Sequence, residues 1–154
     1  MDRPPNPVFF LDKCLGKRVV ASALKDAGQA VELHSDHFPG DAADSDWIPV
    51  VGKQGWVILT KDRSIKSNQI EIMSLLAANT HCFNLVSAEM TGPQMGTAFV
   101  TALDQMIGIV SKTPPPIIGN VTKSGNVTGL LNYTDLLTKL TPPPSSSDFD
   151  SGAI

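Results

Sequence analysis

Short apolar segments alternate with amphipathic segments along most of the chain. Four apolar or alternating runs, bounded by polar and turn residues, predict strands at 8–12, 30–34, 56–62 and 81–87. Apolar residues spaced three or four apart predict helices over about 16–27, 44–53, 67–79 and 93–112. Because strands alternate with helices, the pattern predicts an α/β fold, a three-layer α/β/α sandwich with a mainly parallel sheet.

The C-terminal part of the chain has a different pattern. Residues 117–132 (IIGNVTKSGNVTGLLN) predict a β-hairpin with its turn at 123–126, and residues 133–140 predict a short closing helix. Residues 141–154 are acidic and rich in Pro and Ser, which is typical of a disordered tail. We therefore expect one domain over 1–140 and a tail over 141–154.

Composition and charge narrow the class of protein. The chain has 154 residues, of which 42% are hydrophobic and 18% charged, so it can bury a core. A net charge of −3 does not indicate nucleic-acid binding, so any such binding would depend on local clusters of basic residues. Without a long apolar run or a leader-like start, and with only Cys14 and Cys82, the chain is expected in the cytoplasm and away from membranes.

Acidic residues stand where predicted strands meet one edge of the sheet. Asp12 and Asp62 end two apolar strands, and Asp46 lies at a helix start that follows a third strand. Crowded carboxylates repel one another unless a cation neutralises them, and oxygen ligands favour Mg²⁺ or Mn²⁺. Such ions support hydrolysis of phosphodiesters. The alternative is that these aspartates are turn and capping residues.

The chain resembles the PIN-domain ribonucleases, and more narrowly the PIN-like branch related to VapC toxins. Three blocks carry the resemblance, in matching order and spacing: FFLDKCLGKRVVASALKDAG at 9–28, VELHSDHFPGDAADSDW at 31–47 and GWVILTKDRSI at 55–65. The resemblance implies a parallel α/β/α sandwich whose acidic pocket binds Mg²⁺ or Mn²⁺ and cleaves RNA. It also implies an antitoxin, because a free ribonuclease would poison the cell.

The family's catalytic and metal-binding acids fall by resemblance on Asp12, Asp46 and Asp62. The position of a fourth acid stays open, with Asp44, Asp36 and Glu71 as candidates.

Basic residues adjoin two of these acids in the sequence. Lys13, Lys17 and Arg18 follow Asp12, and Lys61 and Arg63 flank Asp62. They predict a positive, substrate-binding rim for an RNA backbone. The alternative is a solvated helix face.

The leading hypothesis is a metal-dependent endoribonuclease that is the toxin of a type II toxin–antitoxin pair. The alternatives are a non-catalytic PIN-fold binding module and a phosphoacceptor domain. The helix over 93–112 offers an apolar edge of Met95, Phe99 and Met106 and another of Ile109 and Val110. These edges are candidates for an antitoxin or homodimer surface, unless the core buries them.

Overall fold

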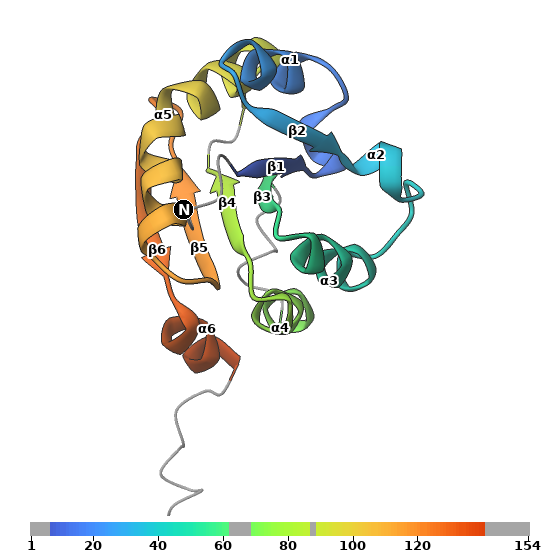
Figure 1. The fold of residues 1–154 in the computed structure, drawn as a ribbon, viewed down its shortest axis with the longest axis vertical. Helices are drawn as coiled ribbons and strands as arrows, with labels where there is room; N and C mark the ends of the chain where they lie inside the picture. Colours follow the sequence, from blue (N-terminus) through green and yellow to red (C-terminus); the bar gives the residue numbers. More distant parts are fainter. Residues whose placement is uncertain (1–6, 62–68, 87–88, 141–154) are drawn as a thin grey trace, which may run out of the picture.

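The apolar runs form one sheet in the computed structural model, which describes residues 7–61, 69–86 and 89–140 (Figure 1). Its strands in these ranges are β1 (Val8–Leu11), β2 (Ala30–Leu33), β3 (Val57–Thr60), β4 (His81–Leu85), β5 (Ile117–Val121) and β6 (Val127–Leu131). They lie in the order β2-β1-β3-β4-β5-β6, parallel except for β6, which pairs antiparallel with β5. The predicted mainly parallel sheet and the C-terminal hairpin are confirmed.

Helices cover both faces of the sheet. They are η1 (Lys13–Leu15), α1 (Val19–Asp26), α2 (His34–His37), α3 (Asp44–Gln54), α4 (Gln69–Ala78), α5 (Gly92–Lys112) and α6 (Tyr133–Leu140). Helices α1 and α5 pack together over one face, whereas α3, α4 and α6 lie over the other (Figure 1). The three-layer sandwich predicted from the sequence is confirmed. Within the described ranges, no helix is long and apolar enough to cross a membrane.

Side chains that alternate along the strands supply two separate cores. In β1, Phe9 and Leu11 join the core under α1 and α5, while Phe10 joins the core under α3 and α4. A strand buried on both faces has to be apolar at nearly every position, which explains the continuous apolar run at the start of the chain. Polar residues in these strands are therefore exceptions that need a reason.

Helix α5 begins at a capping box, in which the Thr91 hydroxyl accepts from the backbone N–H of Gln94 and the Gln94 side chain accepts from the backbone N–H of Thr91. Its edge of Met95, Phe99 and Met106 is buried against the sheet. Of the two alternatives for this edge, burial within the monomer therefore holds, and the edge offers no surface to a partner. Ile109 and Val110 remain half-buried.

A few segments differ from the predictions or lie outside the described ranges. The segment between the predicted strand 30–34 and the predicted helix 44–53 contains the short helix α2, which begins at His34, the last residue of that predicted strand. Asp62, Arg63 and the tail at 141–154 fall outside the described residues.

Two glycines give a matched test of helix packing. A methyl group added at Gly52 in α3 would lie 2.5 Å from the Cβ atom of Ala78 in α4, whereas one at Gly108 in α5 meets nothing within 4 Å. We expect Gly52→Ala to lower the free energy of unfolding by about 1–3 kcal/mol through overpacking. Gly108→Ala should raise it by about 0.5–1 kcal/mol, the ordinary gain in a helix. Urea denaturation measures both, and an equal gain for the two variants would contradict the close approach of α3 and α4.

Candidate active site

The site begins where the strand order reverses, between β1 and β3. Strand β1 has β2 on one side and β3 on the other, and ligands of open parallel sheets bind at such a switch point, outside the carboxyl ends of the strands. Asp12 directly follows β1, and its backbone N–H donates to the carbonyl oxygen of Leu59 at 3.0 Å. This bond extends the sheet by one residue and fixes the Asp12 carboxylate at the switch point.

The Asp12 carboxyl group is buried, with 3% of the residue exposed. The hydroxyl of Thr60, at the end of β3, donates to Asp12 Oδ2 at 2.8 Å. Burial raises the pKa of Asp12, and the Thr60 hydrogen bond opposes this rise without cancelling it. A carboxyl group whose charged form is disfavoured in this way is a candidate catalytic or cation-binding group.

Asp44 is the second carboxylate of the site. It lies half-buried in the first turn of α3, where the indole N–H of Trp47 donates to its Oδ1 at 2.9 Å. Its negative charge also raises the pKa of Asp12, although less than burial does. Trp47 is 1% exposed, and Asp44, three residues earlier on the helix, shares its inward face.

Asp44, rather than Asp46, is the helix carboxylate whose charge raises the pKa of Asp12. The Asp46 side chain is exposed, because it precedes the buried Trp47 by one residue and so points away from the inward face. The role predicted for Asp46 as a ligand is untested and remains a prediction. The same holds for Asp62, which lies outside the described residues.

Two buried polar residues near this edge were not singled out by the sequence. His34, 1% exposed, begins α2, and neither ring nitrogen makes a hydrogen bond. Burial lowers the pKa of His34, against the opposing charge of Asp12, so its imidazole is held neutral. Asn84 in β4 is fully buried, pairs in register with Thr60, and both polar atoms of its amide lack partners. The sequence signal for Asn84 is a single amide within the apolar run HCFNL.

The predicted basic rim is exposed where the structure describes it. Lys13, Lys17, Arg18 and Lys61 all have exposed side chains. The Lys13 ammonium donates to the carbonyl oxygen of Gly40, so it ties η1 to the loop before α3. Lys17 and Arg18 stand between η1 and α1, close in sequence to Asp12. Arg63 lies outside the described residues.

The chemistry of the donor set fits a hard cation. Asp12 and Asp44 offer carboxylate oxygens, the ligand type that Mg²⁺ and Mn²⁺ prefer. Among the described residues no group of three or more His, Cys, Asp or Glu is arranged to hold a metal. Within those ranges the site is therefore a carboxylate pair.

Comparisons with known proteins agree with this fold. The family model described as "PIN like domain" matches residues 7–87, and the chain belongs to this family. The chain is also similar to "Putative ribonuclease VapC45" of Mycobacterium tuberculosis (strain ATCC 25618 / H37Rv), with 27% identity over 120 residues, which cover 75% of this chain and 86% of that protein. No solved structure is significantly similar to the chain. The resemblance to PIN domains and VapC proteins read from the sequence is confirmed.

The pairing of Asp12 with Asp44 can be tested by titration. Asp44→Asn removes a negative charge that raises the pKa of Asp12, so that pKa should fall. Asp46→Asn, two residues along the same helix, is the matched control and should leave the pKa of Asp12 nearly unchanged. Titration of the carboxyl carbons by ¹³C NMR measures both. The assignment fails if Asp46→Asn produces the larger shift.

The burial of Asp12 also predicts how stability depends on pH. Its pKa is higher in the folded state than the ordinary value of 3.8, so the folded state favours the proton and loses stability as pH rises through the folded pKa. Asp12→Asn removes this penalty and keeps an oxygen for the Thr60 hydroxyl. The variant should therefore have a higher free energy of unfolding than wild type at pH 7, and the difference should vanish in acid. Denaturant unfolding across pH tests this, and a variant less stable than wild type at pH 7 contradicts it.

Proposed function

We propose that this protein is a metal-dependent endoribonuclease that hydrolyses phosphodiester bonds of RNA. One observation carries the proposal: a buried carboxyl group of raised pKa, Asp12, stands beside a second carboxylate, Asp44, at the switch point of the sheet. Membership of the PIN-like family and the similarity to a VapC protein named as a ribonuclease support RNA as the substrate.

The ligands that we propose for Mg²⁺ or Mn²⁺ are Asp12, Asp44 and Asp62. A divalent ion bound there would orient a phosphate, activate water and stabilise the leaving oxygen. Asp62 is included because of its position in the sequence, two residues after Thr60. Asp44 joins the proposed set because its negative charge acts on Asp12, and the exposed Asp46 in the same helical turn is the alternative ligand.

The chain's own residues orient these acids. The Thr60 hydroxyl donates to one oxygen of Asp12, and the Trp47 indole N–H donates to one oxygen of Asp44. Fixing a ligand through a neighbouring hydrogen bond reduces the rearrangement needed when an ion or substrate binds. The neutral His34 beside them adds no positive charge of its own. Exposed Lys17, Arg18 and Lys61 would meet the phosphates of the RNA backbone.

We further propose that the protein acts in the cytoplasm as the toxin of a type II toxin–antitoxin pair, with a protein inhibitor as partner. A ribonuclease that acts on cellular RNA needs an inhibitor in its own cell. Apolar side chains exposed on the paired helices α4 and α6, among them Ile70, Met73 and Leu137, offer a surface for such a partner. This surface replaces the buried edge of α5, and a homodimer would use the same apolar contacts.

Activity measurements test the function. Cleavage of single-stranded RNA should require added Mg²⁺ or Mn²⁺, stop with a chelator and increase from acid to neutral pH as Asp12 ionises. Asp12→Asn, Asp44→Asn and Asp62→Asn should each reduce the rate by at least about tenfold, since an amide keeps the shape but removes a charge that holds the ion. Asp46→Asn separates the two helix acids: it should retain most activity when Asp44 is the ligand, and should lose it when Asp46 is.

The product ends distinguish the mechanism. Attack by water, with the 3′ oxygen as leaving group, leaves a 5′-phosphate and a 3′-hydroxyl. Attack by the RNA's own 2′-hydroxyl leaves a 2′,3′-cyclic phosphate. Cyclic ends formed without metal would refute the proposed mechanism, and full activity in Asp62→Asn would remove Asp62 from the site.

A further inference from the structure

A separate pocket lies on the α2–α3 side of the sheet. It encloses about 350 Å³ and is lined by His37, Phe38, Val50, Gln54 and Trp56. These residues come from the end of α2 and the residue after it, from α3, and from the residue before β3. None of them belongs to the acidic pair. Natural small-molecule sites have volumes of about 300–1,000 Å³, so this pocket can take one small planar group.

Aromatic rings form most of the wall of this pocket. The ring centroids of His37 and Trp56 are 5.2 Å apart, and those of His37 and Phe38 are 6.2 Å apart. His37 is exposed, whereas Phe38 and Trp56 are half-buried, so all three rings keep surface on the outside of the core. Partly exposed rings around a hollow are the arrangement that proteins use to stack on bases of single-stranded RNA.

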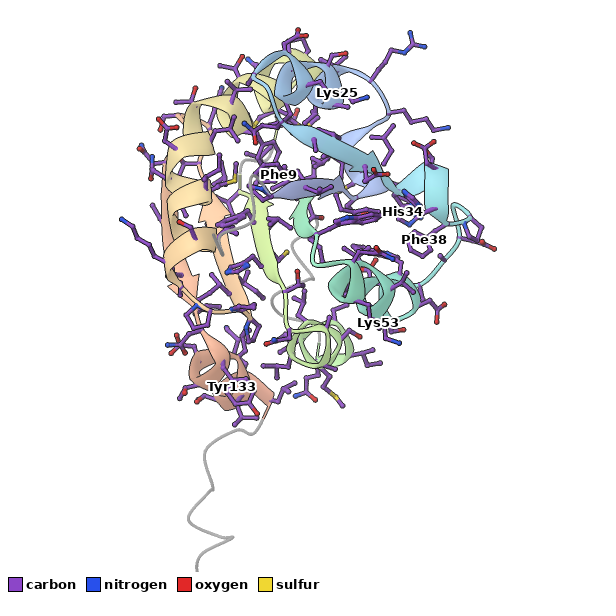
Figure 2. All side chains as sticks on the ribbon, in the orientation of Figure 1. Phe9, Lys25, His34, Phe38, Lys53 and Tyr133 are labelled. Carbon is purple, nitrogen blue, oxygen red and sulfur yellow. The ribbon has the colours of Figure 1, made fainter. Side chains whose placement is uncertain are left out.

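Ring contacts through the core connect the pocket to the acidic pair. The ring of Phe10 stacks on Trp56, with centroids 5.9 Å apart and planes 13° apart, and it lies 5.2 Å from the ring of Trp47. Trp47 in turn donates to Asp44. Figure 2 shows His34 and Phe38 close together where α2 faces α3, in agreement with their 5.5 Å centroid distance. The pocket and the acidic pair are thus connected through one aromatic cluster, whose inner members Phe10 and Trp47 are buried.

The polar groups of the pocket suit a base better than a phosphate. No Lys or Arg lines it, and the imidazole of His37 is held by the Glu32 carboxylate at 2.7 Å, which would repel an anion. The Gln54 amide offers both a donor and an acceptor, which match the edge of a nucleobase. Phosphates would instead follow the exposed basic residues near Asp12.

We propose that this pocket binds one nucleobase of an RNA strand whose backbone runs to the acidic pair. The inference rests on the proposed ribonuclease function for the identity of the strand, and it adds a site that selects or anchors the RNA. Base stacking on Trp56 and Phe38 supplies the affinity, and Gln54 hydrogen-bonds the edge of the base. The pocket therefore sets how far from the bound base the strand is cut.

Binding can be measured without cleavage in the full-length Asp12→Asn protein. The probes are short single-stranded RNAs, each lacking the base at one position, and their affinities are read by fluorescence anisotropy. We expect loss of one particular base to weaken binding by roughly fivefold to a hundredfold, the range found for one base stacked on an aromatic ring. Loss of the others should have a smaller effect. The emission of Trp56 should be quenched by the intact RNA.

Variants connect that base to the pocket. Trp56→Leu should weaken binding of the intact RNA as much as removal of that base does. In this variant, removing the base should cause no further loss of affinity. Since Trp56 packs on Phe10, a second variant guards against misfolding: Gln54 is exposed, and Gln54→Ala should weaken binding by roughly twofold to tenfold, mostly for RNAs that keep the base. The matched control, Tyr133→Leu, removes an exposed ring on α6, away from the pocket, and should change nothing (Figure 2).

The outcomes separate this inference from the proposed function. If wild type cleaves RNA but each missing base weakens binding equally, the base-binding role of the pocket is wrong and the proposed ribonuclease function stands. The base-binding role is also wrong if the loss of affinity at one missing base persists in both Trp56→Leu and Gln54→Ala. The pocket would then bind a protein partner or no ligand. Binding with the expected pattern but without cleavage by wild type supports the pocket and overturns the catalytic proposal. No binding of any RNA overturns both.

Discussion

The rest of the structure depends on one constraint, the burial of the Asp12 carboxylate at the end of a central strand. The backbone N–H of Asp12 donates to Leu59, and its side chain accepts from Thr60, so β1 and β3 hold this acid between them. Burial of a carboxylate opposes its ionisation and weakens the fold above its pKa. A core residue of the same size without charge would avoid that cost. The position of the acid is thus better explained by chemistry than by stability.

A cluster of aromatic rings links this acid to the rest of the molecule. Phe10, two residues before Asp12 in the chain, contacts both Trp47 and Trp56. Trp47 is fully buried in the core under α3 and also donates to Asp44. One contiguous aromatic cluster therefore fills the core through Phe10, holds Asp44 through Trp47 and lines the neighbouring pocket through Trp56. A low-dielectric surround of this kind strengthens every charge interaction inside it.

The sequence predicted the elements well and the side-chain directions less well. Apolar runs such as VFFL and VILT predicted the buried strands. The position of Asp12 at the end of a predicted strand correctly placed it at the edge of the sheet where the candidate site lies. The choice between Asp44 and Asp46 could not be made from spacing, because both lie in the first helical turn and only the burial of Trp47 decides which one points inward. Asn84 and Thr60 meet through strand register, which no local pattern contains.

The strand order alone would fit many unrelated proteins, so function has to be argued from the charges at the switch point. Asp12 and Asp44 repel each other, and among the described residues no Lys or Arg forms an ion pair with either. The nearest cationic side chain in sequence, Lys13, is turned to the carbonyl of Gly40, and the buried His34 favours its neutral form. Among the described residues, the two acids therefore lack a paired cationic side chain. Under the proposed function, a divalent cation would supply that charge, and the repulsion between the two carboxylates would then contribute to its affinity.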